Sequence, residues 1–322
     1  MKSLEASNVF TKSKEEKKSN LILMCKNIPI YNVTTNLILN QQLLPGSISR
    51  GTLTYLEWMK TRYSVGSNVS ARRLMLRAFG SDNHNTSLGQ TRALSLSDCY
   101  WLMYEDENLK FEEVTPYIHK EWDGVGRFQG GSISTLFVNG AADKKWVNKN
   151  TLVKFSSSKE LIPYKLAEQL GLDNLPNVRL EGSDLYISNF TSIDVMLETM
   201  EQSGFVGNAD NPQDLAVTLF KEQAVALFTL DYLVEHDDRH WGNYGFLRDS
   251  NSGEYLGMAH YYDFDWAWSD GVIPLPQMAL TDYKLYIQEL CKKSIEISSM
   301  FDSPYKEVIE KRAKELLLEV SI

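Results

Sequence analysis

The most informative stretch of this chain is Glu235-His236-Asp237-Asp238-Arg239-His240-Trp241-Gly242-Asn243. It follows a long apolar segment, and Gly242 and Gly245 predict a turn here. Asp238 and Asn243 have the spacing that phosphoryl-transfer enzymes use for a catalytic base and a magnesium ligand. The stretch therefore predicts a catalytic loop at the end of a buried helix.

A further acidic residue follows this loop. Tyr244 to Arg248 and Glu254 to Tyr262 flank a turn sequence and predict a β-hairpin, with Asp263 at its end. Magnesium is a hard cation that prefers oxygen ligands. The side chains of Asn243 and Asp263 are therefore predicted to hold Mg²⁺.

The first half of the chain offers partners for a nucleotide. Thr151 to Phe155 is predicted to be a short strand that carries Lys154, and Glu160 follows at the start of a helix that Gly171 would end. In phosphoryl transfer, a strand lysine contacts the phosphates and a helix glutamate holds that lysine. The segment from Gly140 to Lys144 could cover the phosphates with its backbone N–H groups. The predicted cofactor is ATP.

Taken singly, these residues have ordinary explanations. Asp238 and Asn243 could be turn or capping residues, and Lys154 could be a surface lysine. Glu160 suits the first turn of a helix, and Gly140 suits a simple turn. Their combined order along the chain favours a kinase.

The order of predicted elements indicates an α+β protein with two lobes and a cleft between them. We predict a polar N-terminus over 1–20, a mixed, strand-rich N-lobe over 21–190 and a helical C-lobe over 191–322. In the C-lobe, Asn211-Pro212 has the composition of a helix start. The apolar residues from Leu215 to Val234 predict one long buried helix.

The composition limits which functions and which location we expect for this protein. A net charge of −9 over 322 residues argues against direct nucleic-acid binding, which requires basic surface. Three widely spaced cysteines suggest reduced thiols rather than a disulfide framework. We find neither a signal peptide nor a membrane-spanning run. These features predict a cytoplasmic protein, or one delivered to a host cell without a classical signal peptide.

His236 and His240 support an alternative, a zinc-dependent hydrolase. Two histidines at helical i, i+4 spacing with an acid after the first are close to the His-Glu-x-x-His pattern. The acid is Asp237, however, which is one methylene shorter than the glutamate of that pattern. The glycines that follow place His240 where the helix ends. His240 is better interpreted as a support for the catalytic loop.

At these residues the chain resembles the HipA-like serine/threonine kinases, the toxin components of bacterial toxin–antitoxin pairs. Asp238-Arg239-His240-Trp241-Gly242-Asn243 matches the family motif Asp-x-His-x-x-Asn, and Tyr262-Asp263 matches its following Tyr-Asp. Gly140 to Lys144 is similar to the glycine loop of the family, and Val153-Lys154 to its strand lysine. The resemblance runs from about Leu94 to the C-terminus.

The resemblance implies a two-lobed, protein-kinase-like fold and ATP- and Mg²⁺-dependent transfer to a Ser/Thr hydroxyl of a protein. It implies that Asp238 is the base, that Asn243 and Asp263 are the metal ligands, and that Ile187 to Phe190 form the hinge beside adenine. It also implies autophosphorylation and an antitoxin-type protein partner. Phe137 stands where well-studied members carry a phosphorylated serine, and the nearby Ser132, Ser134 and Thr135 are the candidates to take its place. A pseudokinase or non-catalytic partner-binding module remains the other alternative.

Overall fold

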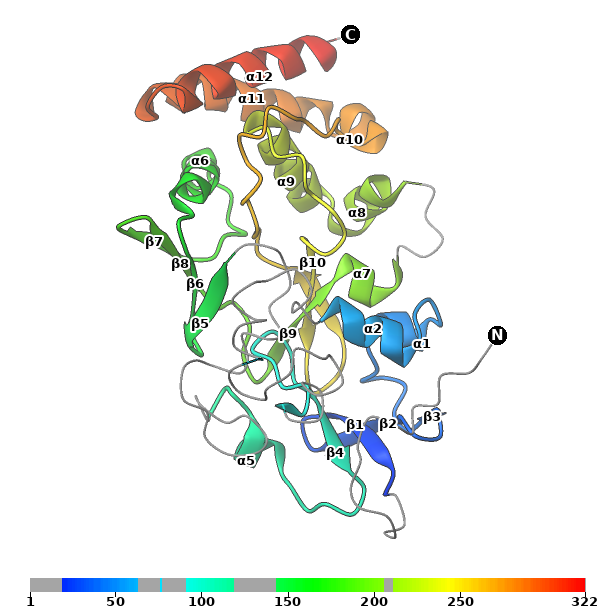
Figure 1. Ribbon diagram of the computed structural model, residues 1–322. Coiled ribbons are helices and arrows are strands. Elements are labelled where there is room, and N and C mark those ends of the chain that lie inside the picture. Colours follow the sequence, from blue (N-terminus) through cyan, green and yellow to red (C-terminus); the bar gives the residue numbers. More distant parts are fainter. Residues whose placement is uncertain (1–18, 63–75, 77–90, 119–142, 206–210, 322) are drawn as a thin grey trace.

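The computed structural model describes residues 19–62, 76, 91–118, 143–205 and 211–321 (Figure 1). Predictions about the rest of the N-terminus, the glycine loop at Gly140, Phe137 and the three nearby hydroxyl residues lie outside these ranges. None of the described helices is long and apolar enough to cross a membrane.

Residues 19–118, so far as they are described, form what we call the N-terminal module. Its antiparallel sheet has the order β3-β2-β1-β4. The strands are β1 (Leu21–Cys25), β2 (Ile28–Asn32), β3 (Leu37–Ile38) and β4 (Tyr100–Tyr104), and the helices are α1 (Gly46–Ser49), α2 (Tyr55–Thr61) and α5 (Phe111–Val114). Trp58, Trp101 and Phe111 are almost fully buried in a hydrophobic cluster made mainly by this module.

A second antiparallel sheet, in the order β5-β6-β8-β7, contains the predicted lysine strand. Its members are β5 (Lys144–Asn148), β6 (Thr151–Lys154), β7 (Val178–Glu181) and β8 (Asp184–Ser188). After β6 come a 3₁₀ turn, η3 (Ser158–Glu160), and helix α6 (Leu161–Leu170). Gly171 ends α6 with a φ of +79°, a left-handed conformation that glycine adopts readily, as the sequence predicts.

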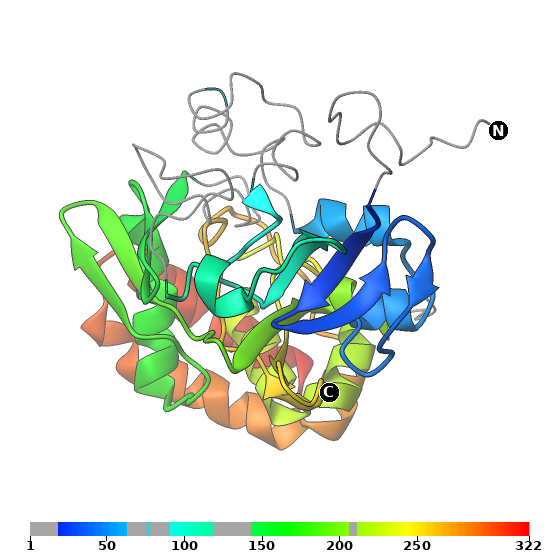
Figure 2. The same cartoon turned by 90° about the horizontal axis from the view of Figure 1, so that it is seen from below.

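The remaining sheet, in the order β11-β10-β9, follows the stretch predicted to be catalytic, since β10 begins two residues after Asn243. Its strands are β9 (Val195–Thr199), β10 (Gly245–Asp249) and β11 (Tyr255–Met258), and the helices of this part are α7 (Met200–Ser203), α8 (Pro212–Phe220), α9 (Glu222–Leu233), α10 (Gln277–Asp282), α11 (Lys284–Ile297), η5 (Ser298–Met300) and α12 (Tyr305–Glu319). Figure 1 shows α11 and α12 packed on the side of α9 away from the sheets. Figure 2 shows the β5–β8 sheet and the N-terminal module on opposite flanks of the molecule.

Two predictions about this part need correction. The segment from Leu215 to Val234 is not one helix, because Lys221 adopts φ +52° and ψ −128° and separates α8 from α9. Asp263 does not lie at the end of the hairpin, because β11 ends at Met258 and a loop follows. The predicted helix start is correct, since the side chain of Asn211 accepts hydrogen bonds from the N–H groups of Gln213 and Asp214.

Candidate active site

Lys154 lies at the centre of a buried ion cluster. Its Nζ is 2.8 Å from Glu160 Oε2 and 2.6 Å from Asp263 Oδ1. Each of the three residues is less than a tenth exposed. Burial disfavours the charge of Lys154, but the two carboxylates outweigh it and raise the pKa of the lysine. β6, the 3₁₀ turn and the loop after β11 therefore meet at one lysine.

Asp263 is held in its charged form. Burial favours the neutral acid, but the cations of Lys154 and Lys144 lower the pKa of this carboxyl well below its ordinary value. Its backbone has a φ of +63°, an uncommon conformation for a residue other than glycine. From this conformation the carboxylate of Asp263 reaches Lys154.

The pKa of Glu160 shifts in the opposite direction to the pKa of Asp263. Burial raises the pKa of the Glu160 carboxyl, although Lys154 acts in the opposite direction. Its Oε1 is buried and has no hydrogen-bond partner among the residues that the structure describes. Glu160 therefore interacts with the cluster through its other oxygen, Oε2.

Lys144 is directly opposite Lys154 in the register of β5 and β6. Directly opposite residues lie on the same face of a sheet, and like charges there repel each other. Burial and the neighbouring Lys154 lower the pKa of Lys144, while Asp263 counteracts them. Two buried ammonium groups this close together are stable only with anions nearby. Asp263 and Glu160 are such anions.

The catalytic stretch forms a loop outside any helix, because α9 ends at Leu233. Within this loop, the N–H of His240 donates to Asp238 O and the N–H of Asn243 donates to His240 O, both at 2.9 Å. The side-chain Nδ2 of Asn243 donates to Asp238 O at 2.9 Å. These bonds place the side chains of Asp238 and Asn243 on one compact turn.

Asp238 is half-buried. Burial is the main cause that raises the pKa of its carboxyl, and the carboxylates of Asp263 and Asp237 add to it, while His240 acts in the opposite direction. A carboxylate with a raised pKa is a better proton acceptor. The environment of Asp238 therefore suits a general base.

Arg239 holds the loop from Glu235 to Asn243 in place through hydrogen bonds. The sequence did not predict this role. The guanidinium of Arg239 forms two bonds of 2.9 Å with Asp231 in α9. It also donates to Asn243 O at 2.9 Å and to Tyr262 O at 2.7 Å. One buried side chain thus joins α9, the catalytic loop and the residue before Asp263.

The histidines do not have the predicted zinc geometry. His236 and His240 both lie beyond the end of α9, so their spacing is not that of one helix face. His236 is fully buried against Phe264, whereas His240 is exposed. Among the described residues, no three His, Cys, Asp or Glu side chains are grouped to hold a metal ion. The side chain of His240 bonds within the loop, since its Nδ1 accepts from the N–H of Gly242 at 3.0 Å.

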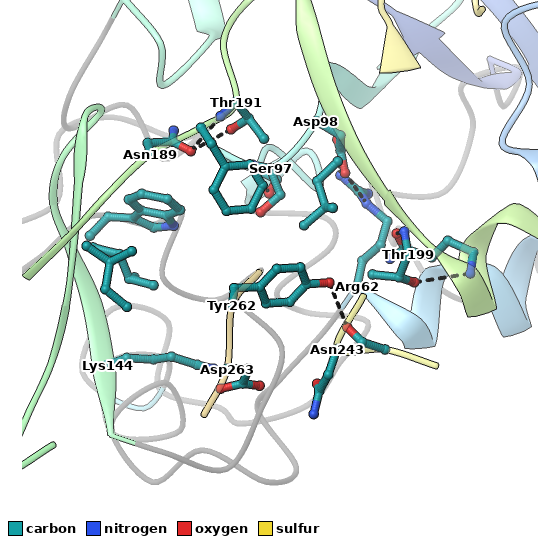
Figure 3. Close-up of a pocket in the computed structure, with 18 of the residues that line it drawn as sticks. Arg62, Ser97, Asp98, Lys144, Asn189, Thr191, Thr199, Asn243, Tyr262 and Asp263 are labelled. Atoms are coloured by element: carbon teal, nitrogen blue, oxygen red, sulfur yellow. Dashed lines mark hydrogen bonds and ion pairs between the residues drawn. The ribbon is translucent and has the colours of Figure 1, made fainter. Parts of the chain in front are cut away.

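A cavity of about 120 Å³ adjoins the ion cluster (Figure 3). Lys144, Lys154, Asn243 and Asp263 line it, and so do the predicted hinge residues Ile187 and Phe190. The ring of Phe190 packs against His260 and Tyr262, at centroid distances of 5.2 and 5.8 Å. The cavity therefore gathers predicted site residues from both halves of the chain. Asp238 and Glu160 do not line it.

The cavity also has lining residues that the sequence did not predict. These come from the N-terminal module and from the strand and short helix that follow the hinge, and include Thr61, Arg62, Ser95, Ser97, Asp98, Thr199 and Gln202. No motif marks them, because they are polar residues scattered over separate segments. Only the tertiary fold brings them together.

Comparisons with known proteins give structural neighbours. No family model matches the chain, and no curated protein does. HipA of Shewanella oneidensis MR-1, solved in a toxin–antitoxin complex with HipB and operator DNA, is 17% identical; the match covers 94% of this chain and 96% of that one, with a TM-score of 0.51. The Helicobacter pylori proinflammatory kinase CtkA is 18% identical; the match covers 57% of this chain and 93% of that one, with a TM-score of 0.38. The chain has the two-lobed α+β fold of HipA-like kinases.

Proposed function

We propose that this chain is an ATP- and Mg²⁺-dependent serine/threonine kinase that acts on proteins. The observation that carries the proposal is the buried bridge from Glu160 through Lys154 to Asp263, beside the loop that holds Asp238 and Asn243. Lysine, glutamate, aspartate and asparagine in this arrangement are the parts that phosphoryl transfer requires. The HipA-like fold agrees with this assignment.

In the proposed reaction, the carboxylate of Asp238 accepts the proton of a Ser/Thr hydroxyl. The hydroxyl oxygen then forms a bond to the γ-phosphorus of ATP, and the bond between that phosphorus and the β-γ bridging oxygen breaks. ADP leaves, and the phosphoryl group stays on the acceptor. Lys154 and Lys144 neutralise phosphate charge in the cavity.

The residues present suit a magnesium ion. Asp263 and Asn243 line the same cavity and offer a carboxylate and an amide oxygen. Because Asn243 donates through Nδ2 to Asp238 O, its Oδ1 remains available as a ligand. Asp263 uses Oδ1 for Lys154 and keeps Oδ2. Bound Mg²⁺ would supply charge neutralisation to the phosphates.

We also propose an antitoxin-type protein partner, because the Shewanella HipA structure contains HipB. Direct contact of this chain with nucleic acid is not part of the proposal, since its net charge is −9. Copurification of a partner encoded beside this chain would test this part.

The function is tested by transfer of radiolabelled γ-phosphate from ATP in the presence of Mg²⁺. We expect Asp238→Asn to lower the rate by about 10²- to 10⁴-fold. Its fold should persist, because the backbone carbonyl of Asp238 makes the loop contacts. The matched control is Asp237→Asn, which changes the exposed neighbouring carboxylate and should retain most of the activity.

Two outcomes would contradict the proposal. If wild-type protein binds ATP but transfers no phosphate to itself or to an antitoxin-type partner, the chain is a pseudokinase. If it binds no ATP with Mg²⁺, the non-catalytic partner-binding module is the better description. If Asp238→Asn and Asp237→Asn lost activity to the same extent, Asp238 would not be the catalytic base.

A further inference from the structure

The cavity beside Lys154 has two ends of different chemistry. The first end is ionic: it carries the ammonium groups of Lys144 and Lys154 together with the carboxylate of Asp263. At the other end, the two charged residues that line the cavity are Arg62 and Asp98, and they pair with each other. Figure 3 shows this pair and Ser97 on the far side of Tyr262 from Lys144 and Asp263.

The Arg62–Asp98 pair is buried and bidentate. Arg62 Nε and Nη2 are 2.9 and 2.6 Å from the two carboxylate oxygens of Asp98. Arg62 also donates to Ala93 O at 3.0 Å, and Asp98 Oδ1 accepts from the N–H of Tyr100 at 2.9 Å. The pair is therefore fixed and charge-balanced, so this end of the cavity does not attract a second phosphate group.

Most of the other residues that line the cavity are neutral. The polar ones include Ser97, Asn189, Thr191, Thr199 and Gln202, and the apolar or aromatic ones include Trp146, Leu152, Ile187, Phe190 and Leu197. The hydroxyl of Ser97 has no hydrogen-bond partner within the described part of the chain. A neutral, polar and partly flat group fits such a lining better than an ion does.

The N-terminal module is fixed to the floor of the cavity at this place. The N–H of Leu197, in β9, donates to Ser97 O at 2.8 Å. Leu197 and Thr199 of the same strand line the cavity as well. Because Ser97 makes this contact through its backbone, its side chain can be changed without breaking the contact.

We infer that the N-terminal module is part of the nucleotide site, and that Ser97 beside the Arg62–Asp98 pair binds the nucleoside portion of the nucleotide. The inference rests on the proposed function, because the phosphates occupy the lysine end. The N-terminal module would then contribute directly to the affinity for the nucleotide.

The test compares two probes, ATP and inorganic tripolyphosphate, by calorimetry in the presence of Mg²⁺. Both carry three phosphates, but only ATP carries a nucleoside. Ser97→Leu fills this end of the cavity and should weaken ATP binding by at least about tenfold, while tripolyphosphate binding stays within about twofold. Ser97→Ala removes one hydrogen bond and should weaken ATP binding by about threefold to tenfold. Ser183→Leu, in the exposed turn between β7 and β8, is the matched control and should change neither value.

The results separate the two proposals. Retained tripolyphosphate binding shows that a Ser97 variant is folded. Unchanged ATP affinity in Ser97→Leu would overturn the inference and leave the kinase proposal intact. Equal weakening of both probes would also overturn it, because Ser97 would then act on the phosphate end or on the fold. Wild-type protein that binds neither probe would instead refute the proposed function.

Discussion

Lys154 Nζ and Asp263 Oδ1 lie 2.6 Å apart, although 109 residues separate them in the sequence. This contact joins the β5–β8 sheet to the loop that follows β11. Neither group is stable alone in this environment, because each is buried and charged. The contact therefore depends on both halves of the fold and, in turn, holds them together.

Replacing Lys154 tests this dependence. Lys154→Met leaves Asp263 and Glu160 buried without their cation, so we expect a loss of about 3–5 kcal/mol in the free energy of unfolding. Kinase activity should also be lost. The loss of stability should shrink as the pH falls toward about 4, where the orphaned carboxylates can take up protons. Urea unfolding at several pH values measures it.

The control for this variant is an exposed ion pair. Lys306→Met removes a 3.9 Å contact with Glu310 at the surface of α12 and should change the unfolding free energy by at most about 1 kcal/mol. Equal effects of the two lysine variants would show that the buried bridge is no more important than a surface pair.

A substitution of Arg239 tests whether the loop with Asp238 and Asn243 must be held in position for activity. Arg239→Lys keeps the positive charge but loses the planar fork that binds Asp231, Asn243 O and Tyr262 O together. We expect a loss of about 2–4 kcal/mol in stability and a larger fall in kcat than in ATP affinity, because the loop becomes misaligned. Thermal unfolding and steady-state kinetics measure the two effects.

Arg179→Lys is the matched control, since Arg179 forms an exposed pair with Glu181. It should be close to neutral, within about 1 kcal/mol. If Arg239→Lys were equally neutral in both stability and kcat, the network around Arg239 would have no positioning role.

The features that sequence reasoning predicted correctly depend on short-range signals. The Asn211 cap and the Gly171 helix end each involve residues a few positions apart. The strand that carries Lys154 was also predicted correctly. Such features follow from local backbone preferences, which the sequence displays directly.

The features that were missed depend on long-range contacts. β1 pairs with β4, far along the chain, and so gives the N-terminal module a core largely of its own. The break at Lys221 has no local signal, because lysine is not a residue that favours a positive φ. The Arg239–Asp231 pair was missed for a related reason: Asp231 lies within an apolar run, and a buried arginine partner for it is visible only in the fold.

The packing of Gly245 leads to a further prediction. A Cβ at Gly245 would come too close to the backbone of Glu198 and Thr199 in the neighbouring strand β9. Gly245→Ala should therefore push β10 from β9, with a cost of about 1–3 kcal/mol. Gly182→Ala is the control: no atom of the described residues lies within 4 Å of its Cβ position, so only the strain of its positive φ remains, about 1 kcal/mol. A smaller cost at Gly245 than at Gly182 would contradict the crowding.

His236 makes the stability of the fold depend on pH. Its Nδ1 is 3.5 Å from Asp231 Oδ1, but neither ring nitrogen forms a hydrogen bond within the described ranges of the chain. Burial lowers its pKa from 6.5 to about 4, so the folded protein keeps it neutral while the unfolded chain binds a proton. Its contribution to stability is therefore complete above about pH 6.5 and is lost progressively as the pH falls toward 4.

Between pH 7 and pH 5 this loss should reach about 2 kcal/mol, since each pH unit below the unfolded pKa costs about 1.4 kcal/mol. His236→Phe keeps an aromatic ring against Phe264 and removes the titration. Its unfolding free energy should fall by about 2 kcal/mol less than that of wild type over the same range. Urea unfolding of both proteins at pH 7 and pH 5 measures the difference. Parallel decreases in the two proteins would mean that His236 is protonated in the folded state or accessible to solvent.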